Sequence, residues 1–85
     1  MKDEVKHFVY ILECKDKTLY VGCTNNLEKR LFEHNNSKNG AHYTKIRRPV
    51  KVLYSEEHPT LADGRRREGE IKRLTRERKL ALVKN

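Results

Sequence analysis

Five side chains of the sequence could together hydrolyse a phosphodiester bond. They belong to Tyr10, Tyr20, Arg30, His34 and Glu68. Tyrosine and histidine can accept and donate protons, and a guanidinium can neutralise a phosphate. A carboxylate can hold a divalent metal ion that stabilises a leaving oxygen. Each residue alone is typical of strand packing, a solvated helix face or a surface ion pair, so only the combination indicates a hydrolytic site.

Length and charge restrict the class of protein. The 85 residues include 20 Lys and Arg against 12 Asp and Glu, which gives a formal net charge of +8. We expect a single domain over residues 1–85, with its core at about 7–82. So basic a surface favours a polyanionic partner, and nucleic acid is a better candidate than a membrane surface.

Two further features concern the compartment. No apolar run approaches the roughly 20 residues that span a bilayer, and no signal-peptide pattern opens the chain, so we expect a cytoplasmic protein. Cys14 and Cys23 lack the spacing of a Cys-x-x-Cys motif. We therefore expect reduced packing residues rather than a disulfide or a zinc site.

The beginning of the chain predicts a β-hairpin. Residues 7–14 and 18–23 are rich in β-branched and aromatic side chains, and a charged turn separates them. Because side chains alternate between the two faces of a strand, the register decides whether Tyr10 and Tyr20 share a face. A two-residue loop would place them on opposite faces.

A three-residue loop at 15–17 is the register that we predict. It pairs Tyr10 with Gly22 and Leu12 with Tyr20, so both tyrosines lie on one face beside a residue that has no side chain. The opposite face is apolar and suited to packing under helices, with Glu13 near the turn where water can reach it. Its apolar residues are Val9, Ile11, Leu19 and Val21.

A helix should follow the hairpin, at about 26–35. Asn26 can cap it, and Leu27 with Leu31 forms an apolar stripe. Arg30 and His34 are four residues apart and therefore lie on one face of this helix.

The rest of the chain predicts an irregular basic loop, a strand and two helices. The loop covers 36–49, and the strand at 51–56 joins the sheet of the hairpin. The helices run over 59–74 and from Thr75 or Arg76 to Val83. The order β-β-α-β-α-α predicts an α+β fold, a three-stranded antiparallel sheet flanked by helices.

These residues resemble a known family. Phe8-Val9-Tyr10 and Tyr20-Val21-Gly22 are similar to the two halves of the signature of the GIY-YIG endonuclease superfamily, and residues 24–31 with His34 follow at its spacing. Further matches to the small stand-alone bacterial branch of the superfamily are Tyr43-Thr44, Arg47-Arg48-Pro49-Val50 and Arg66-Arg67-Glu68 with Ile71-Lys72-Arg73-Leu74. Phe8 stands where the signature has glycine, and Val21 where it often has isoleucine, both at backbone or packing positions.

The resemblance implies a mechanism. Tyr20 would act as or near the general base that activates water, and Tyr10 would orient the nucleophile or the phosphate. Arg30 would bind phosphate, while His34 could relay a proton from Tyr20 or contact the phosphate. Glu68 would hold one Mg²⁺ or Mn²⁺ ion.

Nucleic-acid contacts are expected from basic residues and one aromatic residue, namely Lys29, Tyr43, Lys45, Arg47, Arg48, Arg67 and Lys72. Two hypotheses remain. The first is a metal-dependent endonuclease acting on DNA, on structured or single-stranded substrates in repair or recombination. The second is a non-catalytic nucleic-acid-binding module of the same fold. The sequence does not separate DNA from RNA.

Overall fold

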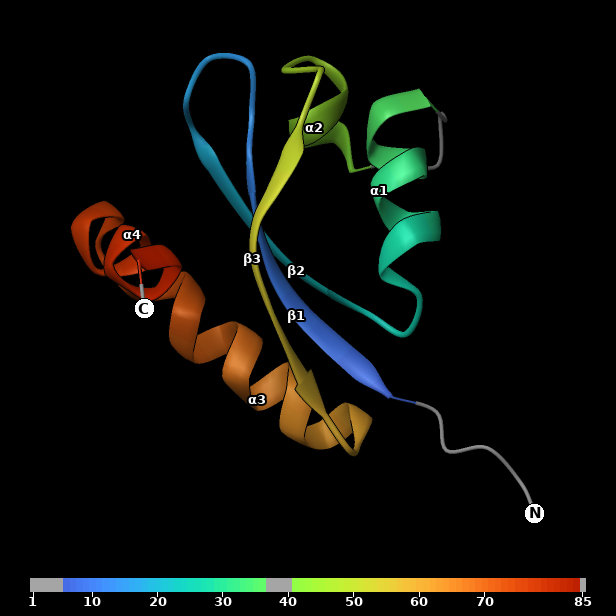
Figure 1. Cartoon of the computed structure of the whole chain (residues 1–85), viewed down its shortest axis with the longest axis vertical. Coiled ribbons are helices and arrows are strands. Elements are labelled where there is room, and N and C mark those ends of the chain that lie inside the picture. Colours follow the sequence, from blue (N-terminus) through green and yellow to red (C-terminus); the bar gives the residue numbers. More distant parts are fainter. Residues whose placement is uncertain (1–5, 37–40, 85) are drawn as a thin grey trace.

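A central sheet divides the molecule into two layers of helix. The computed structural model describes residues 6–36 and 41–84 (Figure 1). Strands β1 (His7–Glu13), β2 (Leu19–Thr24) and β3 (Lys51–His58) form an antiparallel sheet in the order β2-β1-β3. Helices α1 (Leu27–Asn36) and α2 (His42–Lys45) lie on one side of it, and α3 (Leu61–Lys72) and α4 (Arg76–Lys84) on the other. The predicted α+β fold and element order are confirmed.

The hairpin has the predicted register. Tyr10 pairs with Gly22 and Leu12 with Tyr20, and the backbone N–H of Cys14 donates to the carbonyl of Thr18 across the loop at 2.9 Å. The three-residue loop closes because Lys17 adopts a φ of 72°, the left-handed conformation that such loops require. Both tyrosines therefore lie on the face that α1 covers.

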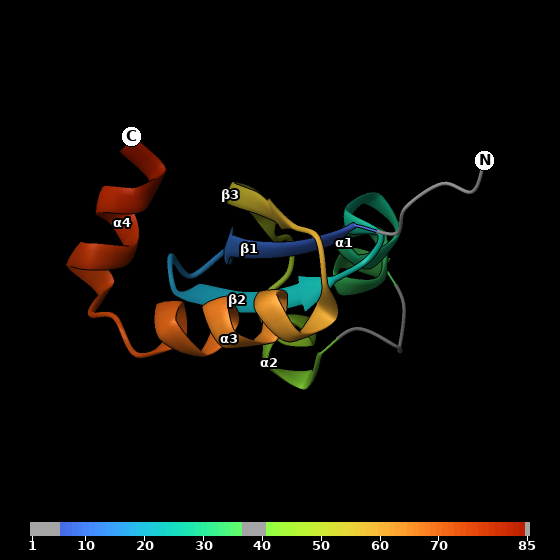
Figure 2. The ribbon, with the colours of Figure 1, turned by 90° about the horizontal axis from the view of Figure 1, so that it is seen from below.

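Each face of the sheet carries its own apolar cluster. On the face of α3 and α4, Val9, Ile11 and Val21 pack with Ile71 of α3 and Leu82 of α4. Figure 2 shows α3 running alongside the strands, with α4 set at an angle to it. Glu13 ends the apolar row near the turn, where it forms ion pairs with two lysines.

On the α1 face, Tyr10, Leu12, Cys14 and Val50 form the second cluster, against which Leu27 and Leu31 pack. Both thiols are free, and the pKa of each is raised, first of all by burial. Cys14 belongs to this cluster, whereas Cys23 packs against the opposite one, so the two thiols lie on opposite faces of the sheet. The expected reduced packing residues are what the structure contains.

The first helix begins one residue later than predicted. The side chain of Asn26 accepts a hydrogen bond from the backbone N–H of Lys29 at 3.1 Å, as a helix cap does. The helix predicted at 59–74 is α3, which is shorter than expected at both ends. Thr60 caps it by accepting from the N–H of Asp63. α4 begins after Thr75, whose hydroxyl accepts from the N–H of Arg78.

Two other expectations need correction. The segment 36–49 is not wholly an irregular loop, because α2 occupies His42–Lys45 within it. The third strand extends to His58 rather than to residue 56, and a register shift between Ile11 and Leu12 lets it follow the twisted neighbouring strand. The α2 helix lies beside the predicted site residues, because its Tyr43 stacks on Tyr20 and its Thr44 meets His34.

Candidate active site

Tyr10 forms the floor of the site. Its side chain is only 2% exposed, and its ring lies directly over the backbone of Gly22. A Cβ atom at position 22 would lie 2.6 Å from Cζ of Tyr10 and would also collide with its hydroxyl oxygen. The absence of a side chain at Gly22 is therefore what lets the tyrosine ring cross the neighbouring strand.

His34 connects this tyrosine to α2. The imidazole is fully buried, and its Nε2 atom lies 3.0 Å from the hydroxyl oxygen of Tyr10. Its Nδ1 atom lies 2.8 Å from Oγ1 of Thr44, which is also fully buried. Tyr10 and Thr44 are therefore the hydrogen-bond partners of the two ring nitrogens of His34.

Arg30 lies one helical turn before His34 and faces the same tyrosine. Its positive charge lowers the pKa of the Tyr10 hydroxyl, against the larger opposing effect of burial, and its Nη1 atom forms a 2.9 Å ion pair with Glu33. Arg48 supports the end of this helix, since its Nε donates to the His34 carbonyl at 2.6 Å and its Nη2 to the Glu33 carbonyl at 3.1 Å. Arg30 is thus held beside Tyr10 by contacts on both sides.

Burial sets the protonation state of this group. It raises the pKa of Tyr10 to about 12, with a smaller contribution from Tyr20 and an opposing one from Arg30. Burial also lowers the pKa of His34 to about 4, helped by the positive charges of Arg30 and Arg48 and opposed by Glu33. At neutral pH, Tyr10 is therefore protonated and His34 is neutral.

Tyr20 is the more accessible of the two tyrosines. Its ring meets the edge of His34, with the ring centroids 5.2 Å apart, and stacks on Tyr43 of α2 at 6.0 Å. Among the residues that the structure describes, no group forms a hydrogen bond with its hydroxyl. The Tyr20 hydroxyl is therefore available to water or to a substrate.

Glu68 of α3 is the acidic residue that belongs to this region. Its side chain is 16% exposed and forms a 3.1 Å ion pair with Lys72, one turn later. Its negative charge contributes to raising the pKa of Cys23 and, as the smallest of several causes, the pKa of Tyr10.

A lone carboxylate restricts the metal that could bind. Within residues 6–36 and 41–84, no three His, Cys, Asp or Glu side chains gather into a metal-binding group. One carboxylate suits Mg²⁺ or a similar hard cation, which keeps several waters and takes its other ligands from phosphate. It does not suit zinc, which binds three or four protein ligands.

The residues expected to bind nucleic acid have different surroundings. Arg47 lies over the ring of Tyr43 at 4.0 Å and pairs with Asp16 in the hairpin loop at 3.0 Å. Arg67 pairs with Glu56 at 2.9 Å and Glu70 at 3.2 Å. These two arginines join elements of the fold as well as carrying charge.

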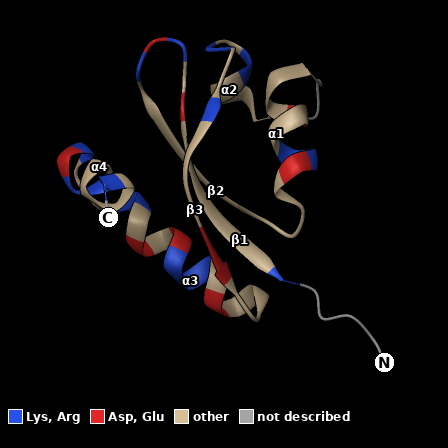
Figure 3. Ribbon diagram, in the orientation of Figure 1, with Lys and Arg blue, Asp and Glu red and all other residues tan. Residues whose placement is uncertain are grey.

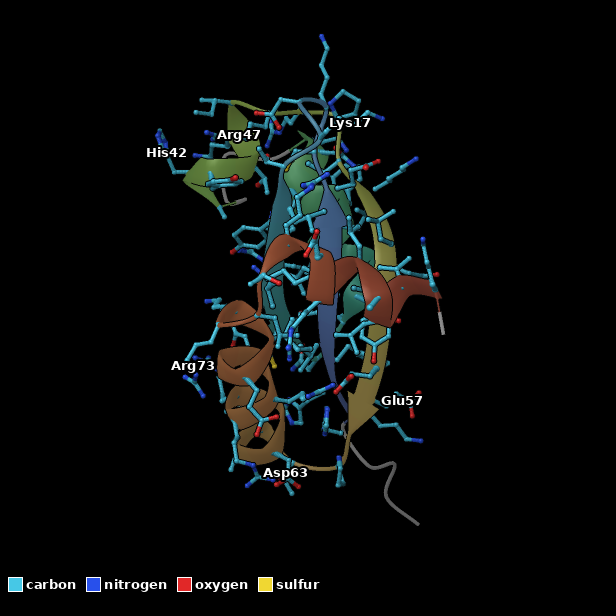
Figure 4. All side chains as sticks on the ribbon, turned by 90° about the vertical axis from the view of Figure 1, so that its left-hand side faces the viewer. Lys17, His42, Arg47, Glu57, Asp63 and Arg73 are labelled. Carbon is cyan, nitrogen blue, oxygen red and sulfur yellow. The ribbon has the colours of Figure 1, made fainter. Side chains whose placement is uncertain are left out.

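Lys29 and Lys45 differ from these arginines, since neither has an acidic partner in the described part of the chain. Charge is unevenly distributed around them (Figure 3). Lysine and arginine gather at the hairpin loop, at α2 and at the start of β3, whereas acidic residues mark the far end of β3, and α3 carries charges of both signs. Figure 4 shows Lys17 and Arg47 at one end of the molecule and Glu57 and Asp63 at the other.

Sequence reasoning missed the contacts that Thr44 forms with His34 and Glu33 with Arg30. Thr44 was only part of a matching dipeptide, and nothing in its local sequence indicates that its hydroxyl meets His34. Glu33 precedes His34 and reads as an ordinary polar helix residue. A pairing of Glu33 with Arg30 could have been found from their spacing of three residues on a helix.

Comparison with known proteins identifies the family of the chain. The family model described as the GIY-YIG catalytic domain matches residues 6–81. A UPF0213 protein of Syntrophus aciditrophicus is 56% identical over 79 residues, which cover 93% of this chain and 91% of the relative. A UPF0213 protein of Clostridium perfringens is 52% identical over 77 residues, covering 91% of this chain and 82% of the relative.

Two solved structures share the fold. The solution NMR structure of a UPF0213 protein from Bacillus halodurans aligns with a TM-score of 0.59 and 39% identity, covering 93% of this chain and 83% of that one. The solution NMR structure of a protein from E. faecalis aligns with a TM-score of 0.65 and 36% identity, covering 99% and 88%. No helix in the described ranges is long and apolar enough to cross a bilayer. The chain belongs to the GIY-YIG family of nucleases, and its relatives are the small bacterial proteins called UPF0213.

Proposed function

We propose that this protein is a metal-dependent endonuclease that hydrolyses phosphodiester bonds in DNA. The observation that carries the proposal is the buried contact of neutral His34 with Tyr10, beside the guanidinium of Arg30. A buried tyrosine hydrogen-bonded to a buried histidine, beside a half-buried arginine, is costly to maintain for packing alone. The three side chains are instead suited to binding a phosphate and stabilising the charge that develops on it.

Each side chain then has a distinct task. Arg30, held by Tyr10 and Glu33, presents a planar guanidinium that can bind two phosphate oxygens. Tyr20 acts at the attacking water, because its hydroxyl has no hydrogen-bond partner among the described residues. Tyr10 and His34 form the polar floor that orients Arg30 and the phosphate.

Glu68 is the residue that would hold Mg²⁺ or Mn²⁺. The metal, when bound, supplies stabilisation of the charge on the leaving oxygen. The ion pair of Glu68 with Lys72 is exposed on the lysine side, so Lys72 can turn away to a phosphate when a cation takes its place.

The proposed substrate is DNA, engaged through its phosphates. Lys29, Tyr43, Lys45, Arg47, Arg48, Arg67 and Lys72 are the proposed contacts. Binding through phosphates predicts steep salt dependence and little base specificity. Recognition of branched, nicked or single-stranded DNA in repair or recombination, in the cytoplasm, completes the proposal.

The ion pair of Glu68 also supports a second candidate. If Lys72 keeps the carboxylate occupied, the protein would bind nucleic acid through its basic surface without cutting it. A binding module needs positive charge only, whereas a nuclease also needs the carboxylate free for the metal.

The decisive experiment compares cleavage of labelled duplex, single-stranded, nicked and branched DNA, and of RNA, with Mg²⁺, Mn²⁺ or EDTA. Tyr20→Phe and Glu68→Ala should abolish cutting, and Glu68→Ala should preserve or strengthen binding because it removes a negative charge near phosphates. Glu70→Ala is the matched control, since it removes an exposed carboxylate two residues away on the same helix. Equal cutting by all four proteins would indicate contamination, and salt-sensitive binding without cutting would favour the binding module.

A further inference from the structure

Thr44 of α2 forms a contact that the proposed roles do not use. Its hydroxyl oxygen lies 2.8 Å from Nδ1 of His34 and 2.9 Å from the carbonyl oxygen of Ala41. A carbonyl can only accept, so the single hydroxyl proton of Thr44 goes to Ala41. The hydroxyl oxygen then accepts from His34, which requires the proton of the neutral imidazole to be on Nδ1.

The surroundings of Tyr10 agree with this tautomer. Arg30, whose positive charge lowers the pKa of the Tyr10 hydroxyl, has only donors and cannot accept the hydroxyl proton. The proton of that buried hydroxyl must therefore be donated elsewhere, and Nε2 of His34 is the acceptor at 3.0 Å. Nε2 can accept only when it carries no proton, which again places the imidazole proton on Nδ1.

We infer that Thr44 is a positioning residue that fixes the tautomer of His34, and through it directs a lone pair of the Tyr10 oxygen at Arg30. The hydrogen bonds run in one direction, from Tyr10 to His34, from His34 to Thr44 and from Thr44 to the Ala41 carbonyl. The catalytic part of this inference rests on the proposed nuclease function, in which Arg30 binds the scissile phosphate.

The other tautomer would disturb Arg30. With the proton on Nε2, His34 would donate to the Tyr10 oxygen. The hydroxyl proton of Tyr10 would then have to point toward the guanidinium, so that two hydrogen-bond donors would face each other. The guanidinium would then lose the acceptor that orients it toward the phosphate. Because α2 also carries Tyr43, which stacks on Tyr20, this short helix influences both tyrosines of the site.

The first test measures the tautomer without any substrate. Long-range ¹H–¹⁵N correlation spectra of the full chain at neutral pH distinguish a protonated Nδ1 from a protonated Nε2. We expect Nδ1–H for His34 in the wild type and in Thr44→Ser, which keeps the hydroxyl. In Thr44→Val and Thr44→Ala the proton should move to Nε2, since a donor at Nδ1 would face a side chain that cannot accept. A wild-type His34 with the proton on Nε2 would overturn the inference, whether or not any variant folds.

The second test measures cleavage. Thr44→Val should lower kcat by about 10- to 100-fold with little change in KM, as losing the partner that orients a functional histidine commonly does. Thr44→Ser should restore most of the rate. Thr75→Val is the matched control, since it removes a hydroxyl from the start of α4, and it should keep the wild-type rate. A Thr44→Val protein with the wild-type tautomer and rate would refute the positioning role.

Failure of the two proposals can be told apart. If no variant and no wild-type protein cuts any substrate, the nuclease function fails while the tautomer measurement still decides the role of Thr44 in orienting His34. If Tyr20→Phe abolishes cutting but Thr44→Val changes neither tautomer nor kcat, the nuclease stands and the inference about Thr44 fails.

Discussion

Acid should destabilise this protein through His34 before its carboxylates titrate. The pKa of the His34 imidazole is about 4 in the folded chain, against an ordinary value of 6.5. A lowered pKa in the folded state means that the unfolded chain takes up the proton first. The contribution of the neutral His34 imidazole to the free energy of unfolding is therefore complete above pH 6.5 and is lost as the pH falls toward 4.

The size of the effect follows from the shift in pKa. The whole difference corresponds to about 3 kcal/mol in the free energy of unfolding, at about 1.4 kcal/mol per pH unit. Between pH 7 and pH 5 the loss from His34 alone should be about 2 kcal/mol. For a domain of this size that corresponds to a fall in Tm of roughly 10 °C. The figure applies to a fully buried side chain, so solvent screening does not reduce it.

Urea unfolding followed by circular dichroism at pH 7, 6 and 5 measures this loss. His34→Gln should be less stable than the wild type at pH 7, but its stability should change by about 2 kcal/mol less between pH 7 and pH 5. His42→Gln is the matched control, because His42 is exposed on α2, and it should follow the wild type. Equal pH dependence in the wild type and in His34→Gln would refute the claim that His34 is buried in its neutral form.

Three further predictions concern the packing at two glycines, the ionisation of Tyr10 and the requirement for metal. Gly22→Ala should lower the free energy of unfolding by about 1–3 kcal/mol, because its Cβ would collide with the Tyr10 ring. Gly69→Ala in α3, where the nearest outside atom is 3.5 Å from the new Cβ, should instead stabilise the helix by about 0.5–1 kcal/mol, and urea unfolding of both variants checks the contrast. The pKa of Tyr10 is raised to about 12, so the stability it contributes is complete below pH 10 and is lost as the pH rises through 12. The pKa of Tyr54 is also raised, by burial and by Glu56, so absorbance titration of the four tyrosines should show Tyr10 as the last to ionise, and Tyr10→Phe should remove that last step. An unchanged titration in Tyr10→Phe would assign the last step to another tyrosine. Cleavage by the wild type and by Glu70→Ala should require magnesium. Glu68→Ala should bind DNA with unchanged or higher affinity in gel-shift assays and should not cut it at any Mg²⁺ concentration. Metal-dependent cutting by Glu68→Ala would contradict the role of Glu68.

The hairpin register could be predicted because the face of each side chain depends only on whether the loop has an odd or an even number of residues. Once Tyr10 and Tyr20 were required to share a face, a three-residue loop was the simplest solution, and Gly22 had to oppose Tyr10. The helix carrying Arg30 and His34 was equally accessible, because its cap at Asn26 and its apolar stripe are local features.

The α2 helix could not be predicted in this way. It is only four residues long, below the length at which a helix is stable alone. Its stability comes from contacts with distant parts of the chain, namely Thr44 with His34 and Tyr43 with Tyr20. The hydrogen-bond partners of His34 could not be predicted for the same reason, since the sequence places His34 on the helix face of Arg30 but does not show which ring nitrogen meets which hydroxyl.

The geometry separates the signature residues that pack from those that can react. Gly22 lies under the Tyr10 ring, and Val21 packs in the opposite cluster, so both are constrained by shape. Val21 therefore replaces isoleucine without touching the tyrosines, because a smaller β-branched residue still fills that layer. Tyr20 is different, since its hydroxyl meets no described partner and packing alone would be satisfied by phenylalanine. Under the proposed function the hydroxyl of Tyr20 acts at the substrate, which makes Tyr20→Phe the variant that separates the chemistry from the fold.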